Sequence, residues 1–282
     1  MAAEKADAIV LGIDAAWTST QPSGVALLKK EGGHWRLLAA SPSDESFLSL
    51  GEDGCDPPTL SRAGSRPEDL LSKAAALAGG QVSLVAVDMP VSSQPITGRR
   101  YSDDSVSRAF GAFGCGTHTP SPARPGQIGQ DLSEGFAAAG YPLATRAPLI
   151  RPGLIEVYPH PALLYLMEAK YRIAYKVSRI HRYWPHLPPA VRRTNLLRIW
   201  REIIAALESS GIALGGLLNL PSVDATRKEL KSFEDTLDAV ICAWVGVCVL
   251  QERAVPYGDD HSAIWIPTIS SLGLRRSAGG QS

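Results

Sequence analysis

Two short apolar runs, each followed closely by an aspartate, limit the possible folds of this chain more than any other feature. Residues 8–14 read AIVLGID and residues 82–90 read VSLVAVDMP. Runs of this length with hardly a polar residue are typical of strands buried on both faces, as in the parallel part of an α/β sheet. An isolated carboxylate is costly in such surroundings. We therefore expect Asp14 and Asp88 to meet a partner.

The first run predicts the start of an antiparallel meander. Two more strands are expected at residues 23–30 and 34–41, and Gly32-Gly33 supplies the two-glycine hairpin turn between them. Strands that follow one another through such short links pair antiparallel.

A helix separates the meander from the second apolar run. It begins at Pro67, has acids in its first turn and ends before two glycines. A helix between two strands forms a crossover, so the second run should lie parallel to the first and beside it. Asp14 and Asp88 would then be neighbours at the carboxyl ends of two parallel strands, where such sheets bind ligands.

The remaining segments complete a single α/β domain over residues 1–282. Residues 91–153 are rich in Gly, Pro and Arg and predict an insertion at the site, with a short helix near 103–110. The stretch LIEVYPHP, residues 154–161, predicts a fifth strand and the start of a helix. Further helices are expected at about 161–175, 188–209 and 232–253, the last with Ser232 and Asp235 at capping-box spacing. The expected fold is a mixed five-stranded sheet flanked by helices, with a helical basic segment over about 161–230.

The charge of the chain is balanced overall but uneven along the sequence. Lys and Arg number 28, as do Asp and Glu, which argues against a surface that attracts nucleic acid everywhere. Residues 169–201, however, contain no Asp or Glu, and their basic residues, among them Lys170, are interleaved with Tyr and Trp. This pattern suits a phosphate backbone with unstacked bases. A solvated helical face whose aromatics belong to the core explains it equally well.

Neither a membrane nor a structural zinc is expected. No apolar run approaches the roughly 20 residues that span a bilayer, and the first residues lack a signal-peptide pattern. The four cysteines form no CxxC pair and have no His at zinc spacing. We expect a cytoplasmic protein, and the oligomeric state stays open.

Acidic residues in apolar settings form the candidate site: Asp14, Asp88, Glu156 and Asp238, with Asp235 one turn before Asp238. Hard oxygen ligands without Cys or clustered His suit Mg²⁺ or Mn²⁺. Two such ions about 4 Å apart would activate a water and stabilise the leaving oxygen in phosphodiester hydrolysis.

These acids also have structural explanations. The two strand-end aspartates could begin Asx-turns, and Asp235 could cap a helix. Glu156 could pair with an arginine of the insertion, for example Arg124 or Arg151. Asp238 has the weakest such explanation, because it lies inside a helix among apolar neighbours.

Six segments in their order resemble a known family: GIDAAW (12–17), VDMPVSSQPITGRRYSDDSVSR (87–108), THTPSPARPG (117–126), IEVYPHPAL (155–163), EDTLDAVICAW (234–244) and GDDHSAIWIP (258–267). They resemble the family called domain of unknown function 429, whose members are predicted RNase H-like nucleases. The resemblance extends over nearly the whole chain. It implies an RNase H-like fold and a metal-dependent nuclease.

The resemblance also implies roles for single residues. Asp14 and Asp88 fall on the strand-end acids of RNase H-like enzymes, Asp238 with Asp235 on the late-helix acid, and Glu156 on the acid before Tyr-Pro. Glu234-Asp235 stands where relatives often have two Asp. The family's polar and basic positions fall on Asp103 and on Arg99, Arg108 and Arg124. The guanidinium groups of these three arginines would clamp phosphate or tether the insertion. His118 and His160 would shuttle protons or serve as local hydrogen-bonding residues.

We therefore expect a metal-dependent nuclease or phosphodiesterase that acts on nucleic acid or on a phosphorylated small molecule. Two alternatives stay open. GIDAAWTSTQPSGVALL also resembles the first phosphate loop of actin-like ATPases and sugar kinases, which would imply an ATP-dependent phosphotransferase, although no second copy of this stretch is present. The other alternative is a ligand-binding RNase H-like protein without turnover, because a fold does not fix its chemistry.

Overall fold

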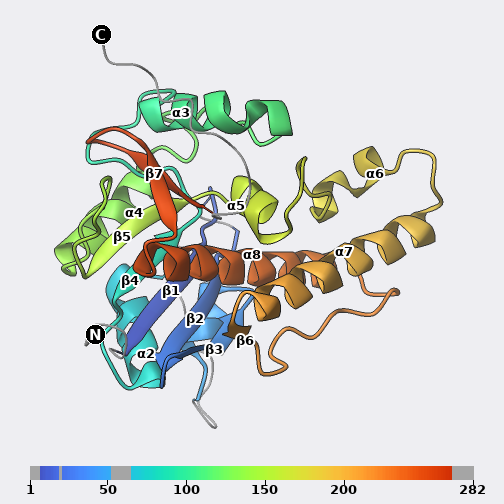
Figure 1. The fold of residues 1–282 in the computed structure, drawn as a ribbon, viewed down its shortest axis with the longest axis horizontal. Coiled ribbons are helices and arrows are strands. Elements are labelled where there is room, and N and C mark those ends of the chain that lie inside the picture. Colours follow the sequence, from blue (N-terminus) through green and yellow to red (C-terminus); the bar gives the residue numbers. More distant parts are fainter. Residues whose placement is uncertain (1–6, 19–20, 52–64, 269–282) are drawn as a thin grey trace.

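The computed structural model describes residues 7–18, 21–51 and 65–268. In these residues eight strands form one mixed sheet, in the order β6-β3-β2-β1-β4-β5-β8-β7 (Figure 1). The strands are β1 (Ala8–Asp14), β2 (Gly24–Glu31), β3 (His34–Ser41), β4 (Leu84–Val87), β5 (Gly153–Val157), β6 (Ile212–Ala213), β7 (Ala254–Gly258) and β8 (Ala263–Pro267).

The centre of the sheet is paired as the sequence predicts. β1, β2 and β3 form the antiparallel meander. β4 lies beside β1 and parallel to it, with Ile13 opposite Val87, and β5 continues the parallel part. The residues that follow Ile13 and Val87 are Asp14 and Asp88, so the crossover argument places these two aspartates correctly.

The expected number of five strands is wrong, because three strands at the margins were missed. β6 has only two residues and is held by its pairing with β3, so it carries no local pattern. β7 contains Pro256, which lowers its strand propensity and is tolerated because β7 lies at the edge of the sheet. β8 is apolar and buried, and it pairs with β5 on one side and β7 on the other.

The helices in the described residues are α1 (Asp44–Leu48), α2 (Pro67–Ala78), α3 (Tyr101–Phe110), α4 (Gln127–Ala138), α5 (Pro159–Leu166), α6 (Ile180–Tyr183), α7 (Pro189–Ser209) and α8 (Arg227–Leu250). The expected helices beginning at Pro67 and spanning 188–209 are confirmed. The short helix near 103–110 is α3, and α4 is a further helix of the insertion. None of these helices is both long enough and apolar enough to cross a bilayer.

Two expected helices have different bounds in the structure. α8 begins at Arg227, because Thr226 and Glu229 form the capping box that was expected of Ser232 and Asp235. α5 ends at Leu166, nine residues before the expected end, and Glu168 follows with a left-handed φ of 48°. The chain from there to Lys176 forms neither helix nor strand, which matters for the site described below.

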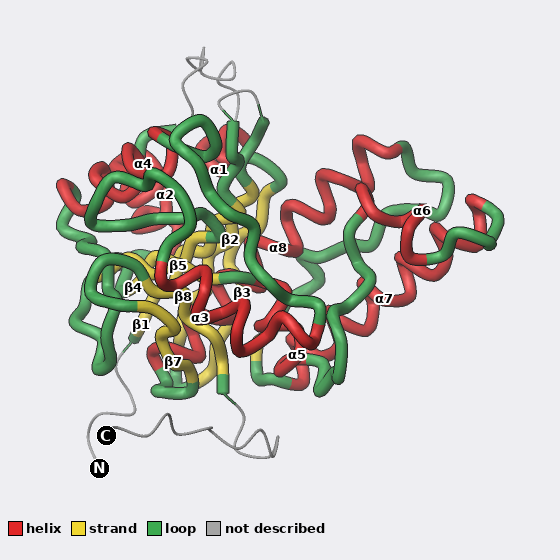
Figure 2. The backbone as a smooth tube through the Cα atoms, turned by 90° about the horizontal axis from the view of Figure 1, so that it is seen from above, coloured by secondary structure: helices red, strands yellow, loops and turns green. Residues whose placement is uncertain are grey.

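Helices cover both faces of the sheet (Figure 2). α8 lies across β1, β2 and β4 on one face, with α5 and α7 beside it. α1, α2 and α4 pack on the other face, and Phe47, Leu70 and Phe136 are buried there. α3 packs against β7 and β8 at the edge.

Two glycines allow α8 to lie very close to the sheet. A Cβ at Gly12 of β1 would lie 2.3 Å from the carbonyl oxygen of Ala239, and a Cβ at Gly24 of β2 would lie 2.2 Å from that of Asp235. Since real Cβ atoms essentially never come this close, any side chain at these positions would push the helix away. Gly24 pairs with Asp14, so this approach places the acidic turns of α8 over the end of β1.

Gly12→Ala should lower the free energy of unfolding by about 1–3 kcal/mol, because the added methyl group overpacks the interface between β1 and α8. Urea unfolding followed by circular dichroism measures this loss. Gly111→Ala is the matched control, because its Cβ would meet nothing within 4 Å and its φ is −61°. The control should leave stability unchanged or slightly raised; equal losses in both variants would contradict the close-packing argument.

Candidate active site

Four carboxylates from three elements gather at the carboxyl end of β1. Asp14 is the last residue of β1, and Asp88 directly follows β4, where its N–H donates to the carbonyl oxygen of Ile13 at 2.9 Å. Asp235 and Asp238 lie one turn apart on α8, which the two glycines bring onto β1 and β2. Each of the other three carboxylates contributes to raising the pKa of Asp14, so the four form one electrostatic cluster.

The negative charge of this cluster is only partly neutralised by the protein. Burial raises the pKa of Asp14 well above its ordinary value, Asp238 adds to the rise, and Lys176 opposes it. Burial raises the pKa of Asp88 to about 7, with Asp238 and Glu156 adding and Lys176 opposing. A raised pKa means that the ionised form is disfavoured here. A positively charged ligand would therefore be stabilised at this end of the sheet.

Asp238 is fully buried and has two partners from the irregular segment after α5. The Tyr175 hydroxyl donates to its Oδ1 at 2.7 Å, and the Lys176 ammonium binds its Oδ2. In the sequence, Tyr175 and Lys176 stand out only as members of the basic segment, and their contact with Asp238 was not predicted. No local signal could reveal it, because the partners are separated by more than 60 residues.

The neighbouring acids of α8 are also paired. Lys231, on the same helix, binds both Glu234, at 2.9 Å, and Asp235. Burial raises the pKa of Asp235, and Lys231 opposes the rise. Glu234 additionally accepts from the N–H of Val177 at 2.5 Å.

Glu156 has a complete set of partners of its own. Arg100 donates to both of its oxygens, at 2.6 and 2.7 Å, and the N–H of Val91 donates at 3.0 Å. Arg100 also binds Asp103, at 2.9 and 3.1 Å, and all three charged side chains are buried. The expectation that an arginine of the insertion pairs with Glu156 is confirmed, but the residue is Arg100 and not Arg124 or Arg151. This network anchors the start of α3 to β5.

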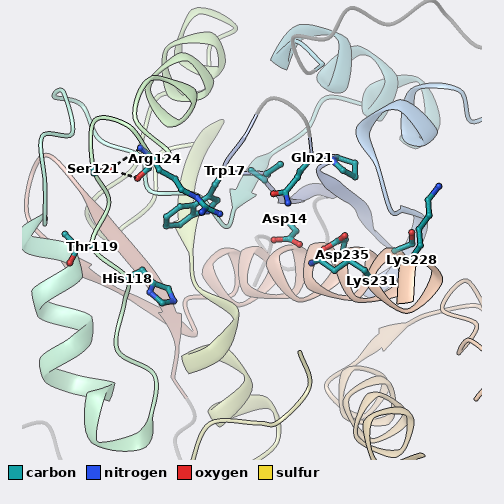
Figure 3. A pocket seen from close by; sticks show the side chains of 14 residues that line it. Asp14, Trp17, Gln21, His118, Thr119, Ser121, Arg124, Lys228, Lys231 and Asp235 are labelled. Atoms are coloured by element: carbon teal, nitrogen blue, oxygen red, sulfur yellow. Dashed lines mark hydrogen bonds and ion pairs between the residues drawn. The ribbon is translucent and has the colours of Figure 1, made fainter. Parts of the chain in front are cut away.

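A cavity of about 810 Å³ opens over Asp14 and Asp235 (Figure 3). His118 and Arg124 of the insertion line one side, while Lys228 and Lys231 of α8 line the other. Trp17, from the loop after β1, also lines it. His118 and Arg124 were selected from the sequence for substrate binding, but Trp17 and the two lysines were not. In the sequence, Trp17 is only an aromatic residue of a loop, and Lys228 and Lys231 are only charged residues near the start of a helix.

The other arginines and the lysine selected from the sequence do not line this cavity. Arg99 binds Asp104, Ser107 and Thr119, and so ties the start of α3 to the following loop. Arg108 and Lys170 are exposed. Their proposed contact with phosphate stays a prediction.

His160 is buried and does not line the cavity. Its Nε2 accepts from the Arg172 guanidinium at 2.5 Å, and its ring meets Tyr158 and Tyr175 edge to face at 5.4 Å. Burial lowers the pKa of His160 well below its ordinary value, and Lys176 and Arg172 lower it further. The imidazole is therefore neutral at pH 7, with its proton on Nδ1.

Part of the basic segment faces inward. Tyr175 and Trp200 are core residues, and the Trp200 indole donates to the carbonyl oxygen of Tyr175 at 2.9 Å. Tyr171 is exposed. Both views show α6 and α7 projecting away from the sheet (Figures 1 and 2). The interleaving of basic and aromatic residues is thus explained in part by packing.

The donor set fits a hard divalent cation in charge and chemistry. Within the described ranges, no three His, Cys, Asp or Glu side chains are already placed around a common metal position. Carboxylate oxygens are nevertheless the ligands that Mg²⁺ and Mn²⁺ prefer. The excess negative charge at Asp14 and Asp88 is what such a cation would offset.

Fold and site together define an α/β protein with a carboxylate site at the carboxyl ends of two parallel strands. Residues 12–262 match the model of a family described as "Protein of unknown function (DUF429)". The chain belongs to this family, as the sequence resemblance indicated. No curated protein and no solved structure matches the chain.

Glu156→Gln should lower the free energy of unfolding by about 1–3 kcal/mol, because it removes one of the two carboxylates that bind the buried Arg100. Chemical unfolding measures the change. Asp260→Asn is the control: it breaks the exposed pair of Asp260 with Arg146 and should change stability little. A Glu156→Gln variant as stable as this control would show that the Arg100 network does not anchor the insertion.

Asp88→Asn should change how stability depends on pH. Because the pKa of Asp88 is raised in the folded protein from 3.8 to about 7, the unfolded chain loses this proton first as pH rises. The free energy of unfolding should therefore fall between these two values, by at most about 1.4 kcal/mol per pH unit for this group. Urea unfolding in a chelating buffer across this range should show a shallower fall in the variant.

Asp69→Asn is the control for this prediction, because Asp69 is a surface carboxylate whose pKa is lowered by Arg66. It should leave the fall in place. Identical curves for Asp88→Asn and the unchanged protein would refute the assignment.

Proposed function

We propose that this protein is a metal-dependent phosphodiesterase or nuclease of the RNase H-like type. The observation that carries the proposal is the convergence of Asp14, Asp88 and the acids of α8 at one end of the sheet, where the protein's own cations leave part of their charge unopposed. A site built at this electrostatic cost is expected where a cationic ligand binds.

The topology supports the RNase H-like assignment. An antiparallel meander is followed by a crossover helix, parallel strands β4 and β5, and a late helix that lies on β1 and carries acids. This is the order of elements that the family resemblance implies. The additional strands β6, β7 and β8 extend the sheet at its edges and leave the central order unchanged.

Asp14 and Asp88 would hold Mg²⁺ or Mn²⁺, and the acids of α8, Asp235 and Asp238, would add to the negative charge that attracts the ion. Such an ion, when bound, lowers the pKa of a coordinated water and stabilises the charge on a leaving oxygen. Asp14 has the central position, because its carboxylate interacts electrostatically with Asp88, Asp235 and Asp238.

The cavity supplies groups for the rest of the substrate. Arg124 and Lys228 would attract phosphate oxygens from opposite sides, and His118 would hydrogen-bond to the same group. Trp17 offers an aromatic surface on which a base could stack. A volume of about 810 Å³ lies in the range of small-molecule sites, so a nucleotide or one end of a nucleic acid strand fits this description.

A non-catalytic ligand-binding protein is the second candidate, and one observation favours it. The Lys176 ammonium already pairs with Asp238, the acid that lies deepest in the site. A carboxylate cluster that already carries its own counter-ion could bind a ligand without a metal ion and without turnover. Metal binding and metal-dependent hydrolysis separate the two candidates.

Asp14→Asn should abolish Mn²⁺ binding in calorimetric titration and lower the rate of phosphodiester hydrolysis by at least about 100-fold, because Asp14 is the carboxylate common to the whole cluster. Hydrolysis is measured with bis(4-nitrophenyl) phosphate and with single- and double-stranded DNA and RNA oligonucleotides in the same buffer.

Asp69→Asn is the control for this prediction, since Asp69 lies on the surface and pairs with Arg66. It should bind Mn²⁺ and hydrolyse substrate like the unchanged protein. Binding of Mn²⁺ without hydrolysis of any substrate would favour the ligand-binding candidate. Absence of Mn²⁺ binding in the unchanged protein would refute the metal-dependent mechanism.

A further inference from the structure

Three consecutive residues clamp two acids of α8. Tyr175 donates through its hydroxyl to Asp238 at 2.7 Å, Lys176 binds the same carboxylate through its ammonium, and Val177 donates its backbone N–H to Glu234 at 2.5 Å. Glu234 and Asp238 lie one turn apart on the face of α8 that meets this segment. The lysine is therefore held between two anchored neighbours.

Residues 175–177 are in turn held in place by contacts with α7 and with the core. The carbonyl oxygen of Tyr175 accepts from the Trp200 indole at 2.9 Å, so α7 holds the backbone of the segment. The side chains of Tyr175 and Val177 are buried in the main core. The ammonium of Lys176 lies 4.9 Å from the centre of the Tyr175 ring and 3.8 Å from Glu234. These contacts fix the position of the Lys176 ammonium group.

Lys231 provides a comparison within the same cluster. It also pairs with two carboxylates, Glu234 and Asp235, but its side chain is 49% exposed, against 19% for Lys176. Lys231 can leave its partners for solvent when a ligand enters the cavity that it lines. Lys176 would have to leave the buried Asp238 without a counter-charge, which is strongly unfavourable.

We propose that the Lys176 ammonium is the permanent cation on the Asp238 side of the site, so that the site takes a single divalent ion, on the side of Asp14 and Asp88. This inference rests on the proposed function. It replaces the two-ion arrangement expected from the sequence. Lys176 pairs with Asp238, a carboxylate that a second ion would otherwise need as a ligand.

The stoichiometry of Mn²⁺ binding tests the inference without relying on activity. Mn²⁺ is titrated calorimetrically into the unchanged protein, Lys176→Met and Lys231→Met, and bound ions are counted independently by electron paramagnetic resonance. The unchanged protein and Lys231→Met should each bind one ion. Lys176→Met should bind two, because removal of the ammonium frees Asp238 to hold a second ion.

Two bound ions in the unchanged protein, or none, would overturn the inference, as would a folded Lys176→Met variant that still binds only one. The folded state is checked by circular dichroism. Where Lys176→Met does not fold, Lys176→Gln takes its place, and the count in the unchanged protein stays decisive.

Hydrolysis is measured separately on the same samples. One bound ion with no hydrolysis of any phosphodiester supports the role of Lys176 and contradicts the proposed function. Under the proposed function, Lys176→Arg should keep one ion and retain more of the turnover number than Lys176→Met, because it preserves the positive charge at the site.

Discussion

The close contact between α8 and the strands β1 and β2 is the constraint on which the site depends. Gly12 and Gly24 let the helix backbone touch the sheet, and α8 is buried along most of its length. The same contact carries Asp235 and Asp238 to the end of β1, where Asp14 and Asp88 already lie. Burial of apolar surface thus holds together carboxylates that would otherwise repel one another.

Two buried ionic groups in this protein have opposite character. Around Glu156, Arg100 and Asp103, every charged group meets a partner of opposite sign in good geometry, as a structural network requires. Burial raises the pKa of Glu156 as well, but Arg100 binds both of its oxygens. Around Asp14 and Asp88, burial raises the pKa of both acids, Asp238 adds to the rise and Lys176 opposes it. The first group holds the insertion in place. The second is where we propose that a cationic ligand binds.

Local sequence predicted the parts of this site that follow from chain geometry. The adjacency of Asp14 and Asp88 follows from two apolar runs and one crossover helix. Arg100 could not be selected over the other arginines of the insertion, because its pairing with Glu156 depends on how α3 docks on the sheet. Lys176 could not be selected for the same reason. The expected helix over 161–175 ends at Leu166, and the irregular chain that follows brings the lysine to Asp238 of α8. The edge strands β6 and β7 owe their pairing to neighbours more than to their own residues.

The inward orientation of this segment also bears on the substrate. Lys176 and Arg172 belong to the basic run, yet their charge is directed at Asp238 and at the buried His160. That charge therefore contributes little to attracting nucleic acid over a long surface. The cations that line the cavity, Arg124, Lys228 and Lys231, surround a volume of nucleotide size. Under the proposed function, this distribution and the zero net charge would favour local recognition of a phosphate group over electrostatic capture of a long polymer.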